Sequence, residues 1–236
     1  MGFHPAIEFY QKYGAPLAGP KVERSDLARL FVRAANKTYM ESKEFEELQK
    51  QIDDRQRRLA EGSLIAELKA RLVIGMSHGR LWGNGFQFHP VYGVPYLPGS
   101  GIKGALRHFL VEQGKTEDEV RSWFGFEDQQ ASVTLFDAYV FPGKKKLLSE
   151  EILNKHHKDY YEPEAGGKIQ PPADYNQPVP VKFVAVAAGV KFRFVYGVLE
   201  GGPTLEELRV ALVECLDLAG MGAKTRKGFG RMVPSK

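Results

Sequence analysis

The order of the apolar segments along the chain is the feature that most constrains its fold. From residue 63 onward, the patterns predict a strand over 66–76, a helix over 99–110, a strand over 131–142, a hairpin of two strands over 181–199 that turns near 188–189, a helix after Thr204 and a short strand over 230–233. Thr204 and Glu207 predict a capping box at the start of the last helix, and its core stripe is expected at Leu205, Leu208, Leu212 and Leu216. The order strand, helix, strand, strand, helix, strand is that of the split βαβ arrangement. We therefore predict an α+β fold with a ferredoxin-like βαββαβ core.

The stretch before this core is helical in pattern. Ser25 is a candidate N-cap for a helix over 26–40, a second, mixed-charge helix is expected over 41–62, and Gly62 is its expected stop. The chain then divides into an N-terminal helical extension, residues 1–62, and a core, residues 63–236. Within the core, residues 143–180 form a stretch too long and too rich in proline for a simple turn, which predicts an insertion.

The composition is that of an ordinary globular protein. Hydrophobic residues make up 43% of the chain, and no apolar run approaches the about 18 residues of a membrane span. No secretory signal is visible, so we expect a cytoplasmic protein without a membrane partner. The single cysteine, Cys215, excludes an internal disulfide, and its helical spacing with Leu208 and Leu212 is typical of a small buried side chain.

Gly99, Gly101 and Gly104 have the G-x-G-x-x-G spacing of a dinucleotide-binding turn. Prolines at positions 90, 95 and 98 argue against the buried parallel strand which that turn requires. A glycine-rich turn that opens a helix still presents free N–H groups to an anion, and Lys103 and Arg107, one helical turn apart, can reach phosphates from the same side. The alternative is that the glycines only permit close helix packing while both cations face solvent.

A second glycine-rich segment, "GAKTRKGFGR" over residues 222–231, carries four cations and no acidic residue. The net charge of +4 is only mildly basic, so this local cluster matters more than the total. Phosphate contacts and base stacking are the two contributions that bind single strands, and Phe229 offers a ring for stacking. The alternatives are a solvated loop for the cations and core packing for Phe229.

Other candidates are weaker. His78, Arg80, Trp82 and His89 lie in a glycine-rich aromatic passage that is a possible RNA-contacting loop, and the alternative for each histidine is a structural role. Asp137 interrupts an apolar strand, either as a hydrogen-bonded structural acid or as a functional group at a strand end. No histidine, cysteine or carboxylate cluster has the spacing of metal ligands, so no metal is expected.

Two of these segments together resemble a known family. "GVPYLPGSGIKGALRH" is similar to the "IPGSSLKG..R" signature of the RAMP superfamily of CRISPR proteins, and "GAKTRKGFGR" is similar to its C-terminal glycine-rich loop. More narrowly, "LFDAYVFP", "HHKDYYE" and "PPADYNQPVPVKF" resemble the sixth-subunit family of type III-B Cmr effector complexes. The resemblance covers roughly residue 70 to the end. One departure is Gly101, where serine is common, and its hydroxyl is lost.

The resemblance implies a ferredoxin-like, RRM-related, noncatalytic subunit of a ribonucleoprotein for antiviral defence. It would bind guide RNA (crRNA) near the 3′ end and support capture of target RNA, with other Cmr subunits as partners and no cofactor. The expected RNA-binding residues are Gly99, Ser100, Gly101, Lys103, Gly104, Arg107, Lys224, Thr225, Arg226, Lys227, Gly228, Phe229, Gly230 and Arg231.

Two alternatives to this function stay open. The first is a metal-independent endoribonuclease that processes guide RNA with a histidine such as His78. The second is a protein-only scaffold whose basic loops bind acidic surfaces of partner proteins.

Overall fold

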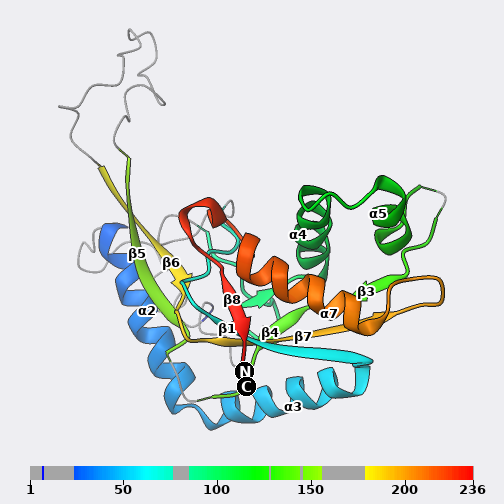
Figure 1. Cartoon of the computed structure of the whole chain (residues 1–236). Coiled ribbons are helices and arrows are strands. Elements are labelled where there is room, and N and C mark those ends of the chain that lie inside the picture. Colours follow the sequence, from blue (N-terminus) through cyan, green and yellow to red (C-terminus); the bar gives the residue numbers. More distant parts are fainter. Residues whose placement is uncertain are drawn as a thin grey trace, which may run out of the picture.

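Six strands form the main sheet. The computed structural model describes residues 7, 24–76, 85–127, 129–143, 146–155 and 179–235. The sheet has the order β2-β4-β7-β1-β8, and β3 pairs with a further part of β7 (Figure 1). All of its pairs are antiparallel. The strands are β1 (Gly62–Leu68), β2 (Tyr96–Leu97), β3 (Val133–Leu135), β4 (Ala138–Val140), β7 (Lys191–Val198) and β8 (Met232–Pro234).

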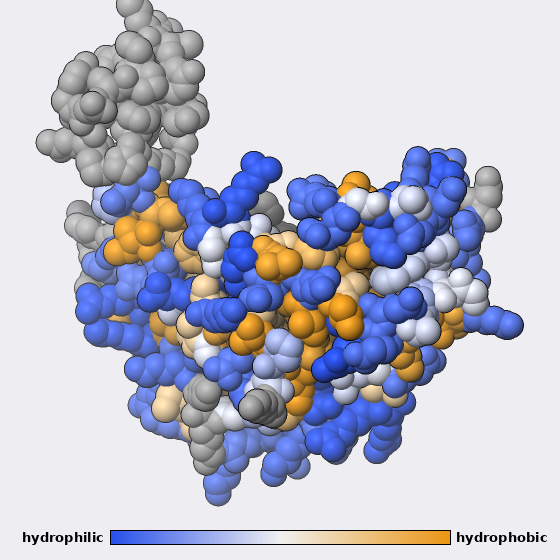
Figure 2. Space-filling view, in the orientation of Figure 1, coloured by the Kyte–Doolittle hydropathy of each residue, from blue (hydrophilic) through white to orange (hydrophobic). Residues whose placement is uncertain are grey.

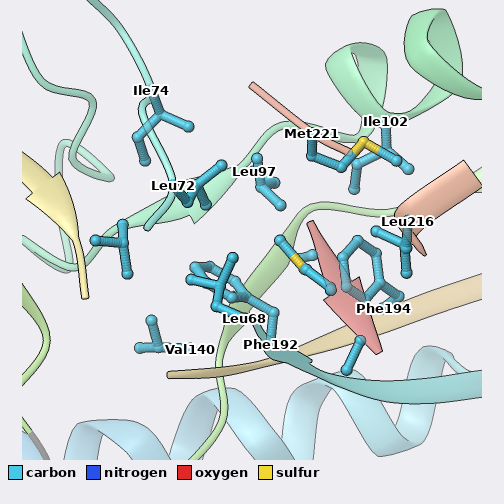
Figure 3. Close-up of a cluster of buried hydrophobic side chains, with 14 of the residues drawn as sticks. Leu68, Leu72, Ile74, Leu97, Ile102, Val140, Phe192, Phe194, Leu216 and Met221 are labelled. Carbon is cyan, nitrogen blue, oxygen red and sulfur yellow. The ribbon is translucent and has the colours of Figure 1, made fainter. Parts of the chain in front are cut away.

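One face of the sheet carries the main apolar core. Phe192, Phe194 and Tyr196 alternate along β7 and are buried, as expected for a strand with one face turned to a core. The helices α4 (Gly99–Glu112) and α7 (Leu205–Glu214), with the π-helical turn η1 (Cys215–Ala219), contribute to the same apolar cluster. Figure 3 shows Phe194 beside Leu216 of η1.

The opposite face of β7 is covered by α3 (Lys43–Leu59), which Figure 1 shows on the other side of the sheet from α4 and α7. Arg193 points to this side, and its Nη2 lies 2.8 Å from Asp53 Oδ1 of α3. Gln56 Nε2 donates to the backbone oxygens of Asp137 (3.1 Å) and Arg193 (3.4 Å). The sheet therefore has no open face over β7.

The helix α2 (Arg24–Glu41) packs against a separate two-stranded sheet of β5 (Leu148–Lys155) and β6 (Val179–Val186). The side chain of Asn36 connects α2 to the start of β5 by hydrogen bonds. Its Nδ2 donates to Leu148 O at 2.8 Å, and its Oδ1 accepts from the N–H groups of Leu147 and Leu148 at 2.9 Å. This buried amide satisfies the backbone where β5 begins.

The predicted pair of strands over 181–199 is correct in position but wrong in pairing. The turn falls over residues 187–190, close to the expected 188–189. However, β6 pairs with β5 along its whole length, while β7 pairs with β1 on one edge and with β3 and β4 on the other. Because both edges of β7 are occupied, β6 pairs with β5 in a separate sheet. The strand β5 lies within the 143–180 stretch predicted as an insertion, and β6 begins at the end of that stretch.

Three other boundaries differ from the predictions. The first strand spans 62–68 rather than 66–76, and Leu72 and Val73 only form isolated bridges. Gly62 opens β1 instead of stopping a helix, and a Cβ there would lie 2.2 Å from the Tyr196 ring. The single strand predicted over 131–142 is two strands, separated by Phe136 and Asp137.

Helix starts follow local hydrogen bonding. Ser42 caps α3, and Ser25 lies inside the first turn of α2 rather than capping it. The predicted capping box of α7 is confirmed, because the side chains of Thr204 and Glu207 each bond the other's backbone N–H. Leu205, expected in the core stripe of this helix, is 41% exposed, and Ala211 is buried instead. A helix without a sequence prediction, α5 (Glu117–Phe124), is capped in the same way by Thr116 and Glu119.

The surface is mostly hydrophilic. Figure 2 shows hydrophobic residues gathered near the centre of one face, over α7 and β8. Exposed apolar side chains of this region are Leu205, Val210 and Leu218. Among the described residues, no helix combines the length and the apolar composition that crossing a membrane requires.

Candidate nucleic-acid interface

The first turn of α4 lies against the break between β3 and β4. A Cβ on Gly99 would lie 2.3 Å from Leu135 O, so this glycine is required for the close approach of helix and strand. The other two glycines of the motif have no such neighbour: a Cβ on Gly101 would meet only Pro98 Cδ at 4.0 Å, and one on Gly104 would meet nothing within 4 Å. The packing interpretation is thus confirmed for Gly99 alone.

Asp137 connects this break to the helix. Its Oδ1 accepts the N–H of Gly99 at 2.8 Å, across 38 positions of sequence. Pro98, at the N-cap position, has no side-chain acceptor, so the Asp137 carboxylate acts as the cap instead. Its negative charge also interacts favourably with the positive end of the helix dipole. Asp137 is therefore a hydrogen-bonded structural acid. The N–H of Gly99 is already occupied, so an anion approaching this helix end would meet a carboxylate.

The exposed flank of α4 carries the rest of the motif. Ser100, Gly101, Gly104 and Arg107 are exposed, and Lys103 is half-buried. In the described part of the chain, neither Lys103 nor Arg107 forms an ion pair. A cationic side chain beside glycines that lack a Cβ leaves room for another chain to approach the helix backbone closely.

The second glycine-rich segment forms a loop between η1 and β8, with the short 3-10 helix η2 (Thr225–Lys227) at its centre. Met221 N–H donates to Gly230 O at 3.0 Å and closes the loop. Two further bonds attach the loop to the segment after β1: Ala223 N–H donates to Val73 O at 2.8 Å, and Gly230 N–H donates to Arg71 O at 2.9 Å. We call residues 222–231 the basic loop.

The backbone of the basic loop needs its glycines. Gly222, Gly228 and Gly230 have positive φ, and a Cβ on Gly222 would lie 2.4 Å from Val73 O. Lys224 also has positive φ, +61°, and no other described residue except glycine does. The left-handed conformation costs an ordinary L-residue about 1–2 kcal/mol, so this lysine is held in a strained position at the entry of η2.

The four cations of the basic loop differ in their surroundings. Arg226 and Lys227 are exposed and Lys224 is half-buried, and none of the three forms an ion pair within the described ranges. Arg231 is different, because its Nη1 donates to Asp217 O at 2.6 Å. The Asp217 carboxylate in turn lies 2.7 Å from Lys69 Nζ. Three loop cations are thus available to an anion, while Arg231 anchors the loop to η1.

Phe229 is half-buried and packs in a small apolar cluster. Its ring centroid lies 6.4 Å from that of Phe183, which is fully buried in β6. Val73 and Ala185 belong to the same cluster. Core packing, the simpler interpretation of Phe229, is therefore confirmed, and base stacking would use only the part of the ring that remains exposed.

The two glycine-rich elements meet at the core. The helix α4 packs against η1, from which the basic loop continues. Figure 3 shows Ile102 of α4 beside Met221, the residue immediately before the basic loop. Both side chains are buried in the main apolar cluster.

A group of four aromatic rings, which includes the candidate residue His89, lies near the first turn of α4. His89 stacks on Tyr92 with centroids 4.2 Å apart, and Tyr96 and Tyr139 complete the group. The N–H groups of Val91 and Tyr92 both donate to His89 Nδ1, at 3.2 and 3.1 Å. Burial lowers the pKa of His89, and Nδ1 can accept these two hydrogen bonds only when it carries no proton, so both effects favour the neutral imidazole.

Some predicted residues lie outside the described residues, namely His78, Arg80 and Trp82. Elsewhere, in the described residues, no group of three or more histidine, cysteine, aspartate or glutamate side chains could hold a metal ion. Cys215 is fully buried, and burial raises the pKa of its thiol to about 12, so it packs as an apolar side chain.

A family model of the RAMP superfamily matches residues 66–233, which is more than half of the chain. The chain belongs to the RAMP superfamily. The match includes both glycine-rich elements of this RAMP protein, α4 and the basic loop.

Two curated relatives are subunits of CRISPR systems. The RAMP chain is 26% identical over 225 residues to the CRISPR system Cmr subunit Cmr6 of Pyrococcus furiosus, covering 70% of this chain and 65% of the relative. It is 28% identical over 174 residues to the corresponding Cmr6 subunit of Saccharolobus solfataricus, covering 71% of this chain and 56% of the relative. The chain thus spans less than two thirds of the length of either relative.

A solved structure shares the fold. A chain of the type III-B Cmr-beta complex bound to cognate target RNA, determined by cryo-electron microscopy, matches with a TM-score of 0.65. The match covers 96% of this chain and 80% of the other, at 24% sequence identity. The two chains therefore share one fold, a mixed α/β architecture with antiparallel sheets in this protein.

Proposed function

We propose that this RAMP protein is a noncatalytic RNA-binding subunit of a cytoplasmic type III-B CRISPR effector complex. It contacts guide RNA near the 3′ end, supports capture of target RNA and binds other Cmr subunits. The similarity to two Cmr6 subunits, and to a chain in a Cmr complex that holds target RNA, supports this assignment.

One structural observation carries the proposal. The cations on the flank of α4 and at the tip of the basic loop, Lys103, Arg107, Lys224, Arg226 and Lys227, have no carboxylate partner among the described residues. Unpaired cations on glycine-rich backbone suit a phosphate chain, which needs charge and close approach more than shape. Because Gly99 N–H is occupied by Asp137, we place the phosphate contacts on the flank of α4 rather than at its first N–H.

The order of the elements supports a ferredoxin-like core in this proposal. The strands β1, β4, β7 and β8 stand in the order β4-β7-β1-β8, and α4 and α7 are the two crossover helices between them. In this assignment the helices α2 and α3 are the N-terminal extension, and the β5–β6 sheet is the added part of the core.

The proposal assigns no catalytic residue. The carboxylate at the first turn of α4 bonds Gly99, the only cysteine is buried, and His89 accepts two backbone N–H groups. We therefore expect RNA to remain intact when it binds.

Charge removal in the basic loop tests the proposal. We expect K224A/R226A/K227A to weaken binding of a labelled single-stranded RNA and to flatten the plot of log affinity against log salt concentration by about 2, since each lost phosphate contact removes about 0.7. Fluorescence anisotropy across a salt series gives both values. The matched control K43A/K50A/R58A removes the same charge from exposed positions of α3. Its slope of log affinity against log salt concentration should equal that of the wild-type protein.

Equal slopes for the loop variant and the wild-type protein would remove the basic loop from the RNA site. Cleaved RNA on a denaturing gel of the same mixtures would contradict the noncatalytic assignment and favour the endoribonuclease. Partner subunits that stay bound in full yield after RNase treatment, with no RNA binding by the chain, would favour the scaffold.

A further inference from the structure

A cavity of about 760 Å³ lies between α3 and the first turn of α4. It is separate from the basic loop, since no residue of 222–231 lines it. Its apolar floor includes Ile52, which is 6% exposed, and Val195, which is 1% exposed. Its volume is that of a pocket for a small molecule of nucleotide size.

Aromatic rings form one wall of the cavity. His89, Tyr92 and Tyr139 all line it. The ring of Tyr92 is held by stacking on His89 at an interplanar angle of 15°, and the ring of Tyr139 is held parallel to Tyr96, with centroids 6.0 Å apart and an angle of 18°. All four residues are half-buried. These rings are fixed by their neighbours yet keep surface at the cavity, which is the arrangement that a planar ligand ring needs for stacking.

The polar groups of the cavity divide into an inner acceptor and an outer cation. Asp137 lines the cavity, and its Oδ1 accepts the N–H of Gly99. Its Oδ2 lies 3.4 Å from the Tyr139 hydroxyl, and because this contact is long, Oδ2 can accept a further hydrogen bond from a ligand. Arg55 is exposed, lines the same cavity, and its Nη1 lies 3.4 Å from the Tyr92 hydroxyl.

This polarity selects the orientation of a ligand. A carboxylate excludes an anion from the inner end and accepts from amino and hydroxyl donors, whereas a guanidinium at the rim attracts phosphate. A ligand with a planar ring carrying an amino group at one end and a phosphate at the other matches both ends, and a nucleotide has this chemistry.

We propose that this cavity binds a nucleotide, with its base stacked on Tyr92 and in edge-to-face contact with Tyr139, which is inclined to Tyr92 by 65°, an amino group of the base donating to Asp137, and its phosphate held by Arg55. The nucleotide is either free or an unpaired residue of an RNA strand, and the second source rests on the proposed RNA-binding function. Because a carboxylate accepts from amino groups, adenine and cytosine bind better than uracil.

Two probes distinguish the sources. Calorimetric titration of the purified full chain with AMP measures binding of a free nucleotide. A single-stranded RNA containing one 2-aminopurine, whose emission falls on stacking, reports entry of a base from a strand, and the anisotropy of an end label on the same RNA reports binding as such.

The variants are Tyr92→Leu, which keeps apolar volume and removes the stacking ring, and Arg55→Gln. Each is expected to weaken the AMP affinity, or the quenching of 2-aminopurine, by about tenfold. The matched control is Arg58→Gln, an exposed arginine of the same helix that does not line the cavity, and it should behave as the wild-type protein. Circular dichroism of each variant shows whether the fold is retained.

AMP binding that both variants weaken supports the cavity as a free-nucleotide site. Quenching without AMP binding, lost in both variants, supports entry of a base from RNA. RNA that binds by anisotropy without quenching, together with no AMP binding, overturns the cavity proposal and leaves the RNA-binding function standing. AMP binding without RNA binding supports the cavity and contradicts the proposed function, and binding of neither probe contradicts both.

Discussion

Asp137 shows how one side chain can fix the start of α4, which carries one of the two glycine-rich elements of the candidate interface. It leaves the sheet between β3 and β4, and its carboxylate accepts the first N–H of α4. The strand break and the helix start are therefore one feature. Three other residues each determine the backbone around them. Gly99 lacks a Cβ and so allows helix and strand to approach closely, Lys224 adopts a left-handed backbone conformation, and His89 accepts hydrogen bonds from two backbone N–H groups.

Replacing Asp137 tests this connection. Asp137→Ala should lower the free energy of unfolding by about 1–2 kcal/mol, because the N–H of Gly99 loses its partner and the helix loses its cap. Asp137→Asn keeps an oxygen acceptor and should lose less. Urea denaturation followed by circular dichroism measures both, and an equal loss in the two variants would show that the hydrogen bond is not the cause.

His89 makes stability depend on pH. Its folded-state pKa is lowered from the ordinary 6.5, mainly by burial, so the unfolded chain binds the proton more tightly. The stabilisation is present above pH 6.5 and is lost as the pH falls from there through the folded-state pKa. His89→Asn keeps an acceptor for the two N–H groups but does not titrate. We expect urea midpoints of the wild-type protein to decline more than those of the variant between pH 7 and pH 5, and parallel declines would contradict this role.

Lys224 carries strain that glycine would relieve. Lys224→Gly should raise the free energy of unfolding by about 0.5–1 kcal/mol, since glycine adopts positive φ freely but loses more chain entropy on folding. The same change should weaken RNA binding, because a cation is lost. Lys227→Gly is the control, with the same charge change at a position of ordinary φ, and it should destabilise. If both variants destabilise equally, the backbone of Lys224 is not strained.

At the scale of elements, local sequence patterns predict the core helices, whereas they do not predict which distant strands pair. The helix over 99–110 is confirmed because Ile102, Leu106, Phe109 and Leu110 are buried on one face, a regularity visible in sequence. The partner of β6 could not be predicted, because β5 contributes few apolar residues and lies within the 143–180 stretch predicted as an insertion. The break at Asp137 was missed because its partner, Gly99, lies 38 positions away.

The candidate site divides in the same way. Cations and glycines of the basic loop are adjacent in sequence, so their cluster was recognised, although their role stays a prediction. The cavity is assembled from α3, the segment around Tyr92 and β4, and its members are far apart in the chain. The sequence offered only scattered aromatic residues as a signal for it.

The helix α4 allows stability and function to be separated. Gly104→Ala should raise the free energy of unfolding by about 0.5–1 kcal/mol, because alanine is the better helix former and its Cβ meets no neighbour. If the open flank admits RNA, the same variant should bind RNA more weakly despite greater stability. Thermal melts and anisotropy give the two values. Unchanged RNA affinity would remove Gly104 from the interface, and Gly99→Ala, which meets Leu135 O, should destabilise instead.

At the scale of the whole molecule, α3 closes the sheet face that α4 and α7 leave uncovered. The pair Arg193–Asp53 joins the two layers, with 9% and 12% of the side chains exposed, and Asp53 also accepts from Arg57 at 2.8 Å. RNA contacts are consequently expected at the glycine-rich elements and at the cavity beside α3, rather than across an open sheet.

Removing the Arg193–Asp53 pair should weaken the packing of α3 on the sheet and lower the free energy of unfolding. Asp53→Ala is expected to cost about 3–5 kcal/mol, because it leaves the buried guanidinium of Arg193 without its partner. The double variant Asp53→Leu with Arg193→Met should recover much of the loss. Chemical denaturation of Asp53→Leu, Arg193→Met and the double variant gives the coupling energy, and purely additive losses would show that the pair does not hold α3 on the sheet.

The central claim is that this RAMP protein binds RNA through unpaired cations without cutting it. The most direct test is fluorescence anisotropy of a labelled single-stranded RNA with the purified full chain across a salt series, with the same mixtures run on a denaturing gel. We expect affinity that falls steeply with salt while the RNA remains intact. Binding that is absent, or independent of salt, or accompanied by cleavage, would contradict the claim.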